Sequence, residues 1–268
     1  MGLPLYIVNA FTQTTFGGNP AAVMPLDDWL PDATLLALAA QHNLSETAFI
    51  VPSGAGAYEL RWFTPGAEVQ LCGHATLASA HVLKAHLDFQ CEEVVFSTRF
   101  SGELRARYVG EGIELDFPSL RPEAHDPEPA LVAALGVPVV AAAIPAVHPW
   151  KALYEVESEA TLRAIVPDFP AIASAVDHAV IVTARGIEHD FVSRFFAPNL
   201  RVNEDPVTGS AHCVLAPYWA KKLGFNELFA AQLSDRGGEL HCALAGDRVR
   251  LTGQCITYAS GDVVASLV

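Results

Sequence analysis

The chain repeats one motif at close to half its length of 268 residues. The stretch Glu68–Ala75 reads Glu-Val-Gln-Leu-Cys-Gly-His-Ala, and Glu204–Ala211 reads Glu-Asp-Pro-Val-Thr-Gly-Ser-Ala. Glu, Gly and Ala recur 136 positions apart, and each copy leads into an apolar run that predicts a helix, over Thr76–Leu83 and His212–Leu223. A repeat of this length constrains the chain to fold as two similar units.

Other segments recur at nearly the same spacing. Arg61–Pro65 is echoed by Arg194–Pro198, and Gly102–Leu104 by Gly238–Leu240. The proline-rich stretch Pro118–Pro129 resembles a linker. We therefore predict an N-terminal half over residues 1–120 and a C-terminal half over 121–257.

Each half reads as short strands plus two helices, an α+β pattern. The helix after the Gly motif is apolar nearly all round, so it must be buried on most faces. A curled, mostly antiparallel sheet wrapped around a central helix would bury it. We predict two pseudo-symmetric halves of this kind.

Composition narrows the functional classes. The net charge of −14 argues against nucleic-acid or membrane partners, while a small anionic substrate needs only a local positive site. The five cysteines form no C-x-x-C pair, and the N-terminus carries no signal sequence, so we expect a cytoplasmic protein. The ten histidines do not cluster at metal-ligand spacing, and we expect no metal.

Differences between the two copies locate candidate chemistry. Glu46 enters an apolar strand, whereas its counterpart falls near Ala179. It could be a proton carrier in a cleft or a surface residue at a strand start. Asp205 stands where the first copy has Val69, and could be functional or a turn residue bonded to its own backbone.

Two more differences lie at the predicted helix starts. His74 corresponds to Ser210, and the helix dipole should favour its neutral form, although a lone histidine is often structural. Cys72 corresponds to Thr208, so a proton-transferring thiol pair would lack one partner. A small buried packing residue is the favoured interpretation of Cys72.

Several blocks together resemble the phenazine-biosynthesis PhzF-like family. They are Gly18–Val23, Asn43–Phe49, Cys72–Ala78, Glu204–His212 and Arg236–Gly238, in the order expected over essentially the whole chain.

This resemblance implies a diaminopimelate-epimerase-like fold with the active site in the cleft between the halves, and a last strand, 258–268, that returns to the first half. It also implies a homodimer, no cofactor, and a glutamate at Glu46 that moves the proton. Gln70 and the stretch Asn199–Asn203 depart from the usual family pattern, which leaves the substrate open.

We therefore expect a cofactor-independent isomerase acting on a small cyclic or amino-acid-like carboxylate. Its catalytic residues would be Glu46, His74 and Asp205. The substrate-binding residues would be Asn19, Gly73, Gly209 and Ser210, with the carboxylate on backbone N–H groups at the helix starts. The alternatives are an amino-acid racemase or epimerase using Cys72, and a non-catalytic binding protein on the same fold.

Overall fold

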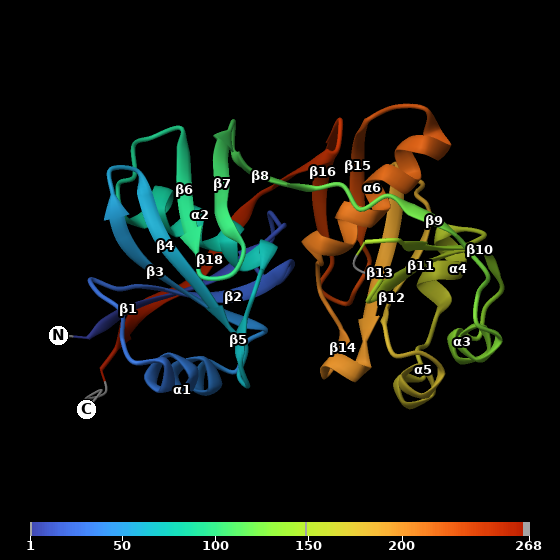
Figure 1. Ribbon diagram of the computed structural model, residues 1–268, viewed down its shortest axis with the longest axis horizontal. Helices are drawn as coiled ribbons and strands as arrows, with labels where there is room; N and C mark the ends of the chain where they lie inside the picture. Colours follow the sequence, from blue (N-terminus) through green and yellow to red (C-terminus); the bar gives the residue numbers. More distant parts are fainter. Residues whose placement is uncertain (1, 148, 265–268) are drawn as a thin grey trace. The chain divides into compact units, whose positions relative to one another are not determined.

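The computed structural model describes residues 2–147 and 149–264. The chain divides into two compact units, which are described separately (Figure 1). Unit 1 contains Met1–Asp116 and Thr252–Val268, and unit 2 contains Phe117–Leu251.

Unit 1 contains a sheet in the order β18-β1-β2-β3-β4-β6-β7-β8. The β2–β3 and β4–β6 pairs are parallel and the others are antiparallel, with the short β5 pairing to the end of β4. The strands are β1 (Leu3–Ala10), β2 (Asn19–Pro25), β3 (Glu46–Gly54), β4 (Ala57–Phe63), β5 (Glu68–Val69), β6 (Glu93–Thr98), β7 (Gly102–Val109), β8 (Gly112–Pro118) and β18 (Cys255–Val263).

Unit 2 contains a sheet in the order β9-β10-β11-β12-β13-β15-β16. Here β11–β12 and β13–β15 are the parallel pairs, and the short β14 pairs with β13. The strands are β9 (Pro122–His125), β10 (Val139–Pro145), β11 (Lys151–Val156), β12 (Ala179–Arg185), β13 (Phe191–Ala197), β14 (Val202–Glu204), β15 (Glu227–Gln232), β16 (Gly238–Ala245) and β17 (Arg248–Gly253).

Both units follow the same sequence of strand directions, and each sheet curls around one helix (Figure 1). In unit 1 this is α2 (Gly73–His86), which packs against β1, β2, β3, β7 and β18. In unit 2 it is α6 (Gly209–Leu223), which packs against β9, β11, β15 and β16. The pseudo-symmetric fold with a buried central helix in each half is therefore confirmed.

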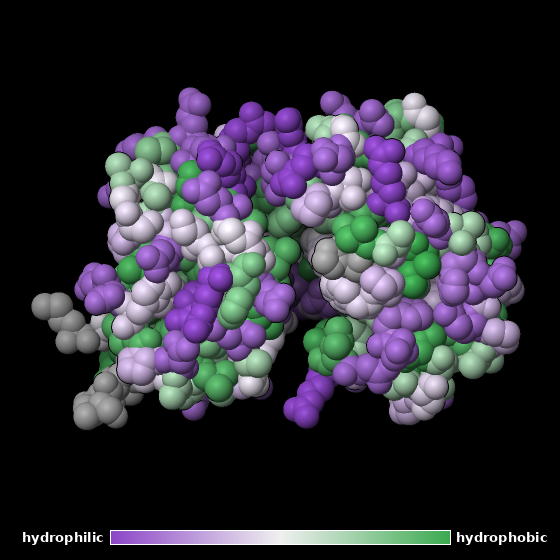
Figure 2. All heavy atoms as spheres, in the orientation of Figure 1, coloured by the Kyte–Doolittle hydropathy of each residue, from purple (hydrophilic) through white to green (hydrophobic). Residues whose placement is uncertain are grey.

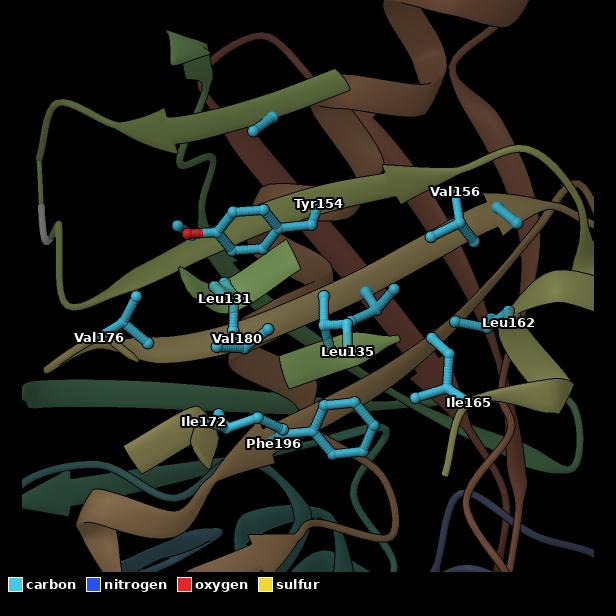
Figure 3. Packing of buried hydrophobic residues seen from close by; sticks show 14 of the residues in the cluster. Leu131, Leu135, Tyr154, Val156, Leu162, Ile165, Ile172, Val176, Val180 and Phe196 are labelled. Carbon is cyan, nitrogen blue, oxygen red and sulfur yellow. The ribbon is translucent and has the colours of Figure 1, made fainter. Parts of the chain in front are cut away.

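The outer face of each sheet is covered by shorter helices. In unit 1, α1 (Asp32–His42) packs on a cluster that includes Met24, Phe49 and Phe63. In unit 2, α3 (Pro129–Leu135), α4 (Glu159–Ala164) and α5 (Phe169–Ala175) cover a larger cluster. Figure 3 shows Leu131 and Leu135 of α3 packed toward Tyr154 and Val180 of the sheet. Alternate strand residues therefore face either these helices or the central helix.

One local detail differs from the sequence-based expectations. The stretch expected as a linker contains β9, whose proline stands at the first position of an edge strand, where no ladder N–H is needed.

The visible surface is predominantly hydrophilic, with exposed apolar residues in small groups (Figure 2). Among the helices of the described residues, none combines the length and apolar character needed to cross a membrane.

The glutamates of the repeated motif have a structural role. Arg61 donates from Nε and Nη2 to the two carboxylate oxygens of Glu68, at 2.7 and 2.8 Å. Arg194 makes the same bidentate contact with Glu204, at 2.7 and 2.9 Å. All four side chains are largely buried. Each pair ties the short strand before the central helix to its neighbouring long strand, which explains why Arg and Glu recur together.

The two pairs differ in what remains when the glutamate is lost. Arg61 also contacts Asp32, whereas the other described contacts of Arg194, with the Ile165 carbonyl oxygen at 2.7 Å and the Phe196 ring, carry no negative charge. We therefore expect Glu204→Gln to lower the free energy of unfolding by about 3 kcal/mol, because it leaves a buried guanidinium without a carboxylate. Glu68→Gln should cost roughly half as much. Urea unfolding of both variants measures this, and equal losses would contradict it.

Candidate active site

Glu46 is the first residue of β3 and faces the central helix of unit 1. It stands opposite Ala21 in the parallel β2–β3 pair. Alternation along β3 sends Phe49 to the cluster under α1, so Glu46 lies on the opposite, α2-facing side. Its side chain is 19% exposed, and His74 Nε2 lies 3.2 Å from its Oε2. Glu46 is therefore a half-buried carboxylate at the helix start, and not a surface residue.

His74 is the second residue of α2 and links several predicted site residues. Its Nδ1 lies 3.4 Å from Asn19 Nδ2, and its Nε2 faces Glu46. With the Asn19 amide nitrogen facing Nδ1, we assign the ring proton to Nε2, toward the carboxylate. The Nε2–Oε2 approach is short but is not aligned as a hydrogen bond, a geometry that catalytic contacts often show before substrate binds.

Burial keeps this imidazole neutral. Desolvation lowers the pKa of His74 from 6.5 to about 4. The neutral form expected from the helix dipole is thus favoured mainly by the removal of water. A neutral ring can donate from one nitrogen and accept at the other, as proton relay requires.

Asn19 is positioned by the turn before β2. Gly18 has φ +70°, and a Cβ there would lie 2.3 Å from the Ala10 carbonyl oxygen. Only glycine fits this close approach. The turn then places Asn19, fully buried, as the first residue of β2 and against His74.

Cys72 completes this cluster. Its Sγ lies 3.5 Å from His74 Nδ1, and the residue is buried. Glu46, Cys72 and His74 can each bring one ligand atom within 4.8 Å of the others, so they are the described residues that could hold a metal ion. However, Cys72 and Glu46 lie beside opposite nitrogens of the ring. That arrangement suits proton relay better than chelation of one ion.

Asp205 lies in unit 2, in the turn that leads into α6. Thr208 Oγ1 donates to its Oδ2, and Gln232 Nε2 donates to its carbonyl oxygen at 2.7 Å. Gln232 is fully buried and also accepts from the Thr208 N–H at 2.9 Å. The turn is thus held by Gln232, a residue that no motif of the sequence singled out. The described contact of the Asp205 carboxylate is with the Thr208 hydroxyl group, which stands where the first copy has the Cys72 thiol.

Gly73 begins α2, and Gly209 and Ser210 begin α6. Within the described part of the chain, neither cap residue, Cys72 or Thr208, bonds the first-turn N–H groups through its side chain. Such helix starts offer N–H groups and a positive dipole end to an anion. The structure thus brings Asn19, Glu46, Gly73 and His74 together in unit 1, and Asp205, Gly209 and Ser210 together in unit 2.

Comparison with known proteins agrees with this fold. The family model described as "Phenazine biosynthesis-like protein" matches residues 8–261. A Pseudomonas aeruginosa protein named as an uncharacterized isomerase is 49% identical, over 98% of this chain and 99% of its own. A crystal structure of a PhzF-family protein from Enterococcus faecalis is 44% identical with a TM-score of 0.94, and each chain is covered completely.

A more distant structure shows how widely the fold is shared. A hydroxyproline epimerase from Agrobacterium vitis, with bound trans-4-hydroxy-L-proline, is 12% identical with a TM-score of 0.57, over 97% of this chain and 92% of its own. This likeness shows that the two proteins share a fold, and the relatives named as isomerases support an isomerase. This chain belongs to the phenazine biosynthesis-like, or PhzF, family.

The buried histidine predicts a dependence of stability on pH. Because the folded-state pKa of His74 is about 4 and the unfolded value about 6.5, only the unfolded state binds this proton between those values. Stability should therefore fall as the pH drops from about 6.5 to 4. His74→Gln should reduce the slope by up to about 1.4 kcal/mol per pH unit.

Urea unfolding at several pH values measures this slope. An unchanged slope in His74→Gln would show that the ring is protonated in the folded protein.

Proposed function

We propose that this protein is a cofactor-independent isomerase that moves a proton on a small cyclic or amino-acid-like carboxylate, with Glu46 as general acid and base. The observation that carries the proposal is the 3.2 Å approach of a neutral, buried imidazole to the half-buried carboxylate of Glu46 at a helix start. Family membership supports the reaction class.

The chemistry needs only a proton carrier. Glu46 takes a proton from one carbon, the bonding electrons delocalise into the conjugated substrate, and Glu46 returns the proton to another carbon. No oxidant or reductant is consumed. His74, with its proton on Nε2, orients the carboxylate and assists the relay.

The substrate carboxylate is assigned to N–H groups at the helix starts. These N–H groups belong to Gly73 at the start of α2 and to Gly209 and Ser210 at the start of α6. Asn19 helps to orient the bound molecule. Asp205 is kept as a group that orients a substrate amine or hydroxyl. A homodimer, suggested by the family resemblance, remains part of this proposal.

A second candidate is a racemase or epimerase with Cys72 as one base. The contact between Cys72 Sγ and His74 Nδ1 favours it, since a neighbouring imidazole can accept the thiol proton. The position of a second thiol is occupied by Thr208, whose hydroxyl already donates to Asp205. Glu46 is therefore the preferred base. The third alternative, a binding protein on the same fold, would show no proton exchange at all.

Proton exchange with solvent distinguishes these functions without a known substrate. Cyclic and amino-acid carboxylates are incubated with the enzyme in D₂O, and loss of carbon-bound proton signals is followed by NMR. For any compound that exchanges, Glu46→Gln should slow the exchange by at least about 100-fold, the usual contribution of a general acid or base. Cys72→Ala should stay within a few-fold of wild type.

The opposite pattern, with exchange lost in Cys72→Ala and kept in Glu46→Gln, would replace the proposal by the racemase. Carboxylates that raise the unfolding temperature but never exchange would favour the binding protein. His74→Gln tests the relay separately, because it should slow exchange while Glu46 is still present.

A further inference from the structure

Lys151 is a buried cation that the proposed chemistry has not yet used. It is the first residue of β11 and is only 1% exposed. Its Nζ donates to the Ser210 carbonyl oxygen at 3.1 Å and lies 3.9 Å from the centre of the Trp150 ring. Among the described residues, no carboxylate oxygen lies within 4.0 Å of Nζ. A buried ammonium without a counter-charge is costly to keep, so its position needs an explanation.

Lys151 and Glu46 lie in equivalent strand pairs of the two units and carry opposite charges. In unit 1 the parallel β2–β3 pair joins Ala21 to Glu46, and in unit 2 the equivalent β11–β12 pair joins Lys151 to Ala179. Lys151 is therefore the counterpart of Ala21, and Ala179 that of Glu46. Each unit carries one ionisable residue in this cross-strand pair.

Both residues are directed to the same place in their units. Glu46 faces His74, the second residue of α2, and Lys151 contacts Ser210, the second residue of α6. His74 and Ser210 stand 136 positions apart, as the repeat requires. The start of α2 thus has a carboxylate beside it, and the start of α6 has an ammonium.

We propose that Lys151 is a positioning residue that makes the start of α6 an anion-binding site, by fixing the Ser210 peptide and adding a full positive charge behind the first-turn N–H groups. This role rests on the proposed function, because it supplies the local positive site that a carboxylate substrate needs on a chain of net charge −14. The helix dipole alone provides about half a charge. A buried ammonium beside it is weakly screened by solvent and raises the potential further.

The titration of Lys151 gives the proposal a pH signature. Burial lowers the pKa of Lys151 from 10.5 to about 8, so the charge is present below that pH and lost above it. The titratable groups that face it from α6 and along its own strand are Cys213, Glu155, Tyr218 and Lys222, of which the last three form their own network. The described residues of β10 contribute no ionisable group. On the face of β12 that Ala179 shares, the ionisable residue is Arg185, which lies at the other end of the strand and pairs with Asp190 at 3.5 Å.

The test compares benzoate with its neutral isostere, benzamide. Binding is measured by calorimetry, and the backbone amide NMR signals of Gly209 and Ser210 report its location. For wild type, benzoate affinity should fall roughly 10-fold as the pH rises through 8, while benzamide affinity stays constant. Lys151→Met should bind benzoate roughly 10-fold more weakly at pH 7 and lose this pH dependence. Lys151→Arg should keep the affinity above pH 8.

Each outcome separates the two proposals. If wild type binds benzoate at Gly209 and Ser210 but neither pH nor Lys151→Met changes the affinity, the role of Lys151 is wrong and the carboxylate site stands. If benzoate and the carboxylates of the exchange screen bind nowhere, the proposed function fails and this role fails with it. Should Lys151→Met not fold, the wild-type difference between benzoate and benzamide through pH 8 still decides the question.

Discussion

The bidentate contact between an arginine and a glutamate, made once in each unit, is the interaction on which both helix starts depend. Arg61 and Arg194 belong to long strands, and Glu68 and Glu204 to the short segments that lead into α2 and α6. Two parallel hydrogen bonds fix both the distance and the orientation of that segment. The backbone therefore enters each central helix along a defined path, and the cap residues need no side-chain bond to the first turn.

A scaffold fixed in this way allows neighbouring positions to change without altering the backbone. The strand pair beside α2 carries Ala21 and Glu46, and the one beside α6 carries Lys151 and Ala179. The small residue in each pair leaves space for the long one toward the helix. Opposite charges can thus be placed at two nearly identical helix starts. The proposed proton transfer and the proposed anion binding would then need no separate folds, because each would use one copy of the same structural unit.

The sequence predicted the parts of this arrangement that are repeated, and missed those that are not. The repeat identified both central helices and the Arg–Glu segments, and the departures from it marked Glu46, His74 and Asp205. Gln232 and Lys151 escaped because they stand outside the repeated motifs, and their contacts with Thr208 and Ser210 arise only from tertiary packing.

The buried cations of the structure differ in what balances them, and this difference separates architecture from chemistry. The guanidiniums of Arg61 and Arg194 are neutralised by carboxylates at hydrogen-bond distance, so they contribute little charge to their surroundings. Lys151 has a neutral carbonyl oxygen and an aromatic ring beside it, which leave its charge uncompensated. An uncompensated buried charge lowers stability unless a ligand of opposite charge completes it. A site that binds a carboxylate would recover that cost on binding, which accounts for a lysine where the other unit has alanine.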